Sequence, residues 1–259
     1  MRKDWITLLS LMVAASMPAI VPAQDAEHYV SPWKTPWTYE QAGDWGQLDS
    51  SYALCNIGKE QSPIDIRDAQ KAALPALQFE YKSSQLKYVI NNGHTIRVNY
   101  HDAHGTGNVL IVGGKQYQLT QFHFHRPSEE YVDGNPFAME VHLMHQASDG
   151  TVAGVTVFLK AGSANSTVQK IWEHMPISEG QQEVSGVDMN PAGLLPHDLG
   201  YYTYMGSQTA PPCTEGVSWF VLKTPIEVSA EQIGAFARLY PRDVRPLQPL
   251  NGRVVKGSQ

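Results

Sequence analysis

The chain has 259 residues, of which 42% are hydrophobic and 17% are charged, and its formal net charge is −6. This length and composition allow one or two domains with a large buried core. The acidic balance and the absence of a dense lysine and arginine stripe argue against a nucleic-acid-binding protein.

The first 23 residues have the pattern of a secretory signal peptide. Arg2 and Lys3 form a short basic start, an apolar run follows from about residue 6 to residue 20, and the small-residue motif VPA ends at Ala23. A single membrane anchor is the competing interpretation, but the apolar run is short for a bilayer and is interrupted by two serines and a proline. We therefore predict cleavage after residue 23, a single mature domain over residues 24–259 without a membrane anchor, and a periplasmic or secreted location.

Export gives meaning to the two cysteines of the chain, Cys55 and Cys213. An oxidising compartment would join this pair, because no other partner is available. Two unrelated buried thiols are the competing interpretation. Two cysteines are too few for a cysteine-based zinc site.

Most of the predicted elements are strands. Residues 24–60 are expected to form an irregular arm anchored by aromatic residues. The segments 85–90 and 94–100 flank Asn-Asn-Gly, which is a strong hairpin signal because Asn-Gly accepts positive φ. Residues 152–160 and 217–223 are nearly continuous apolar runs, as expected of strands that are buried on both faces.

Two helices are predicted, over residues 165–175 and 229–240, and each stops at a proline. The second begins with a capping box of Ser229 and Gln232. The resulting fold class is mainly β with a few short helices (α+β) in a single domain.

The motif QFHFH, residues 121–125, contains two candidate metal ligands. Side chains of a strand alternate between its faces, so Gln121, His123 and His125 share one face and the two phenylalanines share the other. Two imidazoles at this spacing can converge on one metal ion. Taken alone, this His-x-His pattern is a weak signal.

A second strand over residues 137–145 strengthens it. His142 and His145 would lie on opposite faces, so only one of them can join the first pair, and Glu140 shares the face of His142. A turn near residues 133–134 would make the two strands neighbours. Three imidazoles leave a tetrahedral zinc ion one open position, which is the catalytic arrangement. The other histidines are predicted to be surface or core residues without a metal, namely His28, His101, His104, His174 and His197.

These residues belong to a longer set of motifs that follow one another along the chain. They are QSPIDI (61–66), NNGH (91–94), QFHFH (121–125), SEE in place of the usual SEH (128–130), MEVHLMH (139–145), GSQTAPPC (206–213), VSWFVLKTPIEVS (217–229) and RPLQPLNGR (245–253). With them, the chain resembles an alpha-class carbonic anhydrase of the exported bacterial type over residues 37–253. The resemblance implies a large twisted, mostly antiparallel sheet with a central zinc cleft.

The resemblance also implies an activity, which is the reversible hydration of carbon dioxide to bicarbonate by zinc-bound hydroxide. The zinc ligands would be His123, His125 and His142, and Gln121 and Glu140 would be their hydrogen-bond partners. The partners of the protein would be small molecules, carbon dioxide and bicarbonate. The sequence is compatible with a homodimer but does not determine the oligomeric state.

Further roles follow from the resemblance. Thr209 would orient the hydroxide and donate its own proton to Glu129, and His94 would be the proton shuttle. The remaining implied positions are a substrate pocket of Met144, Gln208, Val217 and Trp219, a cavity water network at Tyr39, and a disulfide between Cys55 and Cys213.

Simpler interpretations compete with these roles. His94 follows an Asn-Gly turn and could be an exposed turn histidine, and Thr209 could be an ordinary polar residue before two prolines. Glu129 and Glu130 are adjacent, and periodicity alone does not choose the buried one. The chain also departs from the family at Gln208, Ala210, Asp243 and Arg97, which puts substrate docking and inhibitor preference in doubt.

Other functions compete with this one. The spacing His-x-His-x3-Glu, residues 123–129, also fits a cupin-type metal enzyme with Glu129 as a ligand, but the glycine-rich and proline-rich second cupin motif is missing around His142. A secreted binding module related to carbonic anhydrases is another alternative. Such a module would typically lack one or more zinc histidines, whereas this chain has His123, His125 and His142. The segment SQLK, residues 84–87, matches a serine hydrolase motif only at chance level.

Overall fold

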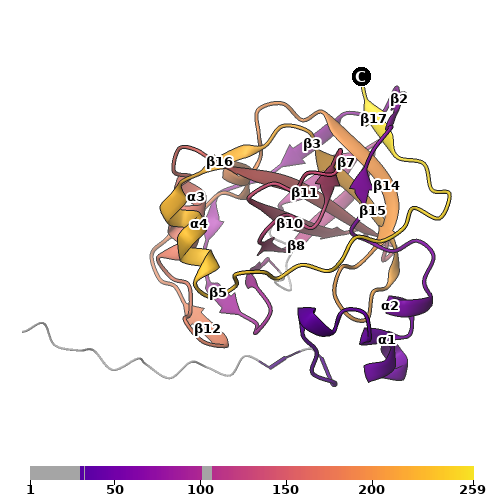
Figure 1. The fold of residues 1–259 in the computed structure, drawn as a ribbon. Coiled ribbons are helices and arrows are strands. Elements are labelled where there is room, and N and C mark those ends of the chain that lie inside the picture. The colour runs from indigo at the N-terminus through magenta and orange to yellow at the C-terminus, as the bar shows by residue number, and fades with distance from the viewer. Residues whose placement is uncertain (1–29, 32, 101–106) are drawn as a thin grey trace, which may run out of the picture.

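The computed structural model describes residues 30–31, 33–100 and 107–259. The predicted signal peptide and three of the remaining histidines, His28, His101 and His104, lie outside these residues. The described part is built around a mixed β-sheet of 13 strands (Figure 1).

Ten strands form the main path of this sheet. In spatial order they are β12 (Gly180–Glu183), β5 (Tyr88–Asn91), β6 (Ile96–Asn99), β8 (Lys115–His125), β10 (Met139–Gln146), β11 (Val152–Ala161), β15 (Glu215–Leu222), β14 (Tyr201–Ser207), β17 (Lys256–Ser258) and β2 (Gln70–Ala72). Strand β16 (Ile226–Val228) pairs with β11, and β3 (Leu77–Glu80) joins β8 through β7 (Val109–Val112).

Two small sheets accompany the main one. They pair β1 (Asp65–Ile66) with β9 (Tyr131–Val132), and β4 (Ser84–Gln85) with β13 (Asp188–Met189). Pairing in the main sheet is mostly antiparallel, as expected, and the parallel pairs there are β11 with β15, β11 with β16, and β17 with β2. The predicted hairpin is confirmed, because β5 and β6 are antiparallel neighbours across Gly93, which has a φ of 83°.

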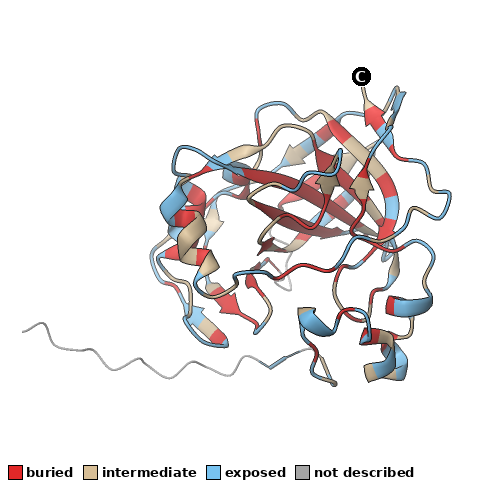
Figure 2. Cartoon of the chain, in the orientation of Figure 1, coloured by how far each residue is buried: buried red, intermediate tan, exposed pale blue. Residues whose placement is uncertain are grey.

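The strands that carry the predicted metal ligands are buried in the core. Strands β8, β10 and β11 run side by side through the middle of the sheet, and Figure 2 shows them as largely buried. Phe122 and Phe124 are fully buried on the face of β8 that is opposite to the histidines. They fix the strand by packing, and a large hydrophobic cluster contains both of them.

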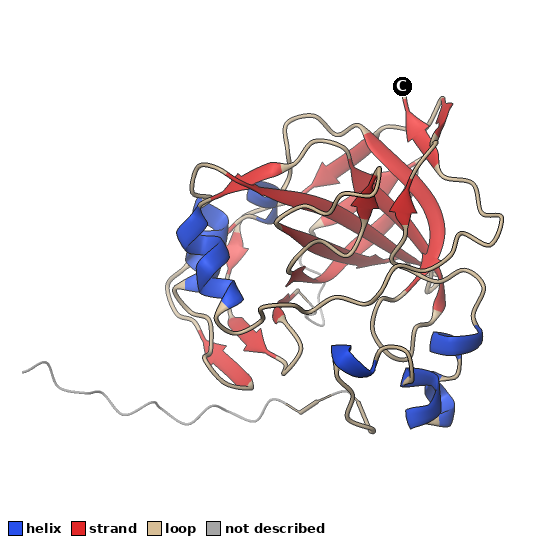
Figure 3. Ribbon diagram, viewed as in Figure 1, coloured by secondary structure: helices blue, strands red, loops and turns tan. Residues whose placement is uncertain are grey.

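Helices are short and lie at the periphery (Figure 3). The two predicted helices are confirmed as α3 (Ser166–Trp172) and α4 (Ala230–Ala237), and they pack together through the stacked rings of Trp172 and Phe236, whose centroids are 5.6 Å apart. A further turn, η3 (Pro191–Leu194), contacts α3. Among the described residues, no helix is both long and apolar enough to cross a membrane.

The arm is more ordered than the sequence indicated. Its described part contains η1 (Tyr39–Gln41), α1 (Trp45–Leu48), η2 (Ser50–Tyr52) and α2 (Leu54–Ile57). Each is a single turn, too short to show the helical periodicity on which sequence prediction depends. The arm carries its own hydrophobic cluster, in which Trp37, Trp45 and Tyr52 pack with Cys55 and Cys213.

The capping box of α4 gives a test of the fold. The Ser229 hydroxyl accepts a hydrogen bond from the backbone N–H of Gln232, and the Gln232 side chain accepts one from the backbone N–H of Ser229. Replacing Ser229 with alanine should lower the free energy of unfolding by about 1 kcal/mol. Urea denaturation checks this value, with Ser163→Ala as a control; equal midpoints for wild type and Ser229→Ala would contradict it.

Candidate metal centre and active site

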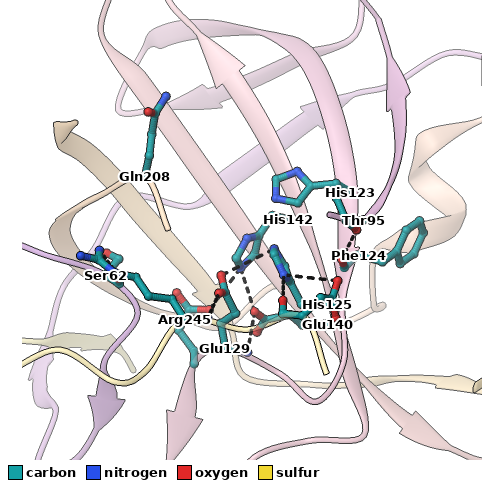
Figure 4. A network of polar contacts seen from close by, with 12 residues as sticks. Ser62, Thr95, His123, Phe124, His125, Glu129, Glu140, His142, Gln208 and Arg245 are labelled. Atoms are coloured by element: carbon teal, nitrogen blue, oxygen red, sulfur yellow. Dashed lines mark hydrogen bonds and ion pairs between the residues drawn. The ribbon is translucent and has the colours of Figure 1, made fainter. Parts of the chain in front are cut away.

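The register of β8 and β10 brings three histidines together. His142 lies directly opposite His123, and Glu140 lies directly opposite His125. Opposed residues of neighbouring strands point to the same face of the sheet, so the three imidazoles converge. Their ring centroids are 4.8–5.3 Å apart, and Figure 4 shows the rings gathered beside Glu129 and Glu140.

The nitrogen atoms of this group fit a metal ion. His125 Nε2 and His142 Nδ1 are buried without a hydrogen-bond partner, and the ligand atoms of the three histidines lie within 4.8 Å of one another. A buried polar atom without a partner is costly, so these nitrogens are suited to an ion. Burial and the neighbouring histidines lower the pKa of His123 and of His125 well below the ordinary value, which keeps both rings neutral. A histidine binds zinc as a neutral imidazole.

The other ring nitrogens of the first two histidines are held by oxygen atoms. Nδ1 of His123 lies 2.8 Å from Oε1 of Gln121, and Nδ1 of His125 lies 2.8 Å from the backbone carbonyl oxygen of Asp243. These acceptors fix a proton on Nδ1 and leave Nε2 of each ring as the ligand atom. The sequence indicated Gln121 but did not indicate that the Asp243 carbonyl is the partner of His125.

His142 is held in the opposite tautomer by two carboxylates. Its Nε2 lies 3.0 Å from Oε1 of Glu140 and 3.2 Å from Oε2 of Glu130. Glu140 was expected here from the sequence, whereas Glu130 was noted only as a departure from the usual SEH motif. All three side chains are fully buried.

The two carboxylates change the ionisation of this group. Burial acts to lower the pKa of His142, but Glu140 and Glu130 outweigh it and raise that pKa well above its ordinary value. Burial, reinforced by the charge of Glu130, raises the pKa of Glu140. Burial also acts to raise the pKa of Glu130, but contact with His142 outweighs it and lowers that pKa. Glu130 and Glu140 therefore favour a positive charge at the His142 ring. A proton or a metal ion can supply this charge.

Glu129 is buried on the other side of the cluster. Its Oε1 accepts a hydrogen bond of 2.7 Å from the backbone N–H of Arg245, and the Thr209 hydroxyl hydrogen-bonds to its carboxylate. Burial raises the pKa of Glu129 to about 7, although His142, Arg245 and Thr209 all act to lower it. Glu129 and Glu130 are thus both buried, and they face different partners.

A cleft of about 300 Å³ opens above the three histidines, which form part of its wall. Met144, Gln208 and Trp219 line it as the sequence predicted, and so do Thr209 and Arg97. Val217 is 2% exposed and packs with Met144 and Trp219 in a core cluster, away from the cleft surface. A glycine makes room for the Trp219 ring: a Cβ at Gly154 would lie only 2.5 Å from it.

His94 lies at the cleft among aromatic side chains of the arm. Its ring is stacked on Trp37 at a centroid distance of 3.7 Å and meets the edge of Trp33 at 4.7 Å. Trp33 Nε1 donates a hydrogen bond of 2.8 Å to the carbonyl oxygen of Pro211, so the arm is tied to the loop of Thr209. Burial lowers the pKa of His94 to about 4. Tyr39, predicted to border the cavity, also lines the cleft.

The predicted disulfide is confirmed, with the Cα atoms of Cys55 and Cys213 at 5.0 Å. A hydrogen-bond network around it reaches Glu129 through Arg245, which was not singled out in the sequence. Its guanidinium donates to the carbonyl oxygen of Cys55 and to Oε1 of Gln61, both at 2.8 Å, while its backbone N–H holds Glu129. The disulfide and Glu129 are therefore connected by buried hydrogen bonds of Arg245.

His145 does not take part in the site. It lies on β10 but faces away from the cluster, and its Nε2 is 2.6 Å from the hydroxyl of Tyr81. It is a buried core histidine with a hydrogen-bond partner at Nε2.

Comparison with known proteins agrees with this geometry. The family model described as eukaryotic-type carbonic anhydrase matches residues 40–259. A carbonic anhydrase of Neisseria gonorrhoeae is 42% identical over 225 residues, which cover 85% of this chain and 87% of the relative. A carbonic anhydrase of Pectobacterium atrosepticum is 38% identical over 251 residues, covering 95% of this chain and 97% of the relative.

Solved structures agree as well. The alpha-carbonic anhydrase of Thermovibrio ammonificans, solved with the inhibitor sulfanilamide, superposes with a TM-score of 0.80 at 41% identity, covering 88% of this chain and 100% of that one. The family match replaces the cupin interpretation of the His-x-His motif. The chain is therefore an enzyme of the alpha-class, or eukaryotic-type, carbonic anhydrase family.

Proposed function

We propose that this enzyme hydrates carbon dioxide reversibly to bicarbonate and a proton, with a zinc ion held by His123, His125 and His142. The observation that carries the proposal is the convergence of three imidazoles at a cleft, two of them with a buried nitrogen that lacks a partner. Zinc bound there would be a Lewis acid that makes water ionisable near neutral pH, an effect for which carbonic anhydrase itself is the standard example.

The protein's first contribution is to orient the ligands and to keep two of them, His123 and His125, neutral. Gln121 and the Asp243 carbonyl hold the Nδ1 protons of His123 and His125. A ligand set of three imidazoles adds no negative charge of its own to the ion, so the ion keeps its full power to polarise water.

The second contribution is to orient the nucleophile. When the Thr209 hydroxyl donates to Glu129, its oxygen can only accept a hydrogen bond from a group in the cleft. An ionised water in the cleft would then point its hydrogen at Thr209 and a lone pair at carbon dioxide. A dication at the histidines would lower the pKa of Glu129 from about 7 and favour the ionised carboxylate that this arrangement needs.

The third contribution is a place for the substrate. Met144 and Trp219 form an apolar wall next to the histidines, suited to the nonpolar carbon dioxide molecule. Gln208 adds a polar side chain at the rim, where it is exposed. Bicarbonate is anionic, and Arg97 in the same wall offers it a positive charge.

The proposed proton shuttle is His94, which predicts a buffer-dependent effect. Replacing His94 with alanine should lower turnover about tenfold in dilute buffer, and added imidazole should restore part of it. The expected loss is smaller than is usual for a proton-transfer residue, because the stacked ring has a pKa of about 4 and is poorly matched to its task there. Stopped-flow turnover at rising buffer concentration measures the effect.

A control variant separates the shuttle from its surroundings. Trp33→Ala should release one side of the ring and raise the pKa of His94, as followed by proton NMR. Equal turnover of wild type and His94→Ala at low buffer would show that His94 is not the shuttle.

We also propose that the protein is exported, with residues 1–23 as the signal peptide and residues 24–259 as the mature domain. The disulfide supports an oxidising location such as the periplasm or the medium.

Stopped-flow hydration of carbon dioxide with a pH indicator tests the proposed function. The zinc-loaded protein should show a rate far above that of the buffer, and chelation should remove it. A zinc-loaded, folded protein that hydrates carbon dioxide no faster than buffer would overturn the proposal.

A further inference from the structure

We propose that Glu130 is a positioning residue that orients His142 for the metal and adds a buried carboxylate to the site, so that it strengthens zinc binding. This inference rests on the proposed zinc site. Glu130 stands where the usual SEH motif has histidine. The sequence led us to expect Glu140 alone to hold His142, and we now assign part of that role to Glu130.

Both carboxylate oxygens of Glu130 have a polar partner. Its Oε2 is 3.2 Å from Nε2 of His142, and its Oε1 accepts a hydrogen bond of 3.1 Å from the Tyr204 hydroxyl. The backbone carbonyl of Glu130 also accepts a hydrogen bond of 2.8 Å from the hydroxyl of Ser128. A side chain that is fully buried and held at both oxygens can fix the direction of the imidazole it contacts.

Glu140 contacts the same nitrogen in a different way. Its Oε1 is 3.0 Å from the same Nε2, but that oxygen already accepts a hydrogen bond of 2.8 Å from the backbone N–H of Glu129. One N–H of His142 therefore lies between two carboxylates, and Glu140 is partly committed to holding the segment that carries Glu129. Glu130 is the carboxylate whose oxygen makes a well-directed hydrogen bond with the ring.

Two consequences follow for a metal ion at Nδ1 of His142. First, two acceptors at Nε2 hold the proton on that nitrogen, so Nδ1 keeps its lone pair for the ion. Second, a carboxylate in a dry interior attracts a dication far more strongly than it would in water. Both effects should make zinc binding tighter. They add to the orientation that Gln121 and the Asp243 carbonyl give to His123 and His125.

Glu130→Gln tests the proposal because it keeps the size of the side chain and removes its charge. Zinc affinity, measured by competition with a chelator, should fall about 10–100-fold, the range typical of a lost ligand partner. The melting temperature of the metal-free protein, measured beside it, shows whether the variant is folded when its zinc affinity is compared. Glu227→Gln is the matched control, since Glu227 lies on β16 in an exposed ion pair with Lys160 and should leave zinc affinity within twofold.

Tyr204→Phe supplies a second, independent arm. It removes the other partner of Glu130 without touching His142, so zinc affinity should fall a few-fold, and adding it to Glu130→Gln should cause no further loss. Wild type that binds no zinc would overturn the proposed function itself. Wild type that binds zinc tightly while folded Glu130→Gln binds within twofold of it would overturn only this inference. If Glu130→Gln does not fold, unchanged zinc affinity in Tyr204→Phe overturns it.

Discussion

Replacing His142 with alanine should reduce carbon dioxide hydration to the rate of the buffer and abolish stoichiometric zinc binding. The change removes a ligand outright, so the loss should exceed the 10–100-fold that follows from losing a ligand's partner. It also leaves Glu130 and Glu140 facing each other without the cation between them, which should lower the free energy of unfolding by about 3–5 kcal/mol. Zinc content by mass spectrometry and hydration by stopped flow measure the two effects.

His145→Ala is the matched control for this prediction. Both histidines are fully buried on β10, three positions apart, but His145 contacts Tyr81 and faces away from the cluster. It should therefore keep one zinc per chain and most of the activity, although the cavity it leaves will lower stability. Loss of zinc in His145→Ala with retention in His142→Ala would show that the ligand set is wrong. If His142→Ala does not fold, His123→Ala, at a half-buried position, takes its place.

Removing the disulfide should have the largest effect on stability. Cys55 and Cys213 are 158 positions apart, and on the chain-entropy model their bond stabilises the fold by roughly 4–5 kcal/mol. The double variant Cys55→Ser, Cys213→Ser should therefore melt roughly 8–20 °C below wild type. Activity at 25 °C should fall as well, because Cys213 lies in the same loop as Thr209 and the disulfide shares the Arg245 network with Glu129.

A reducing agent provides the control for the disulfide. Wild type treated with dithiothreitol should match the melting temperature of the double variant, and the double variant itself should not respond. A shift of less than about 3 °C in both would contradict the predicted contribution of the bond.

The histidine cluster could be predicted from the sequence because strand geometry is local. Period-two alternation placed His123 and His125 on one face and separated His142 from His145, and each of these placements agrees with the register of β8 and β10. The helix over Ala230–Ala237 was equally accessible, since its capping box lies within four residues. Identification of the motifs then supplied the sheet and the activity, which no single strand determines.

What the sequence did not show depends on contacts between distant segments. The partner of His125 is a backbone carbonyl 118 residues away, which leaves no signal in the identity of the side chain. Alternation could not choose between Glu129 and Glu130 because both follow the end of β8, where the chain is no longer extended, and both proved to be buried. Arg245 is a comparable case, because a buried arginine is recognisable only once its acceptors are in place.

Zinc titration of the metal-free protein tests the central claim most directly. Activity should be at the buffer rate before zinc is added, rise in proportion to added zinc, and level off at one zinc per chain, because the proposed function needs one ion at His123, His125 and His142. Full hydration activity without zinc, or a plateau at one zinc per chain with no hydration, would contradict the account.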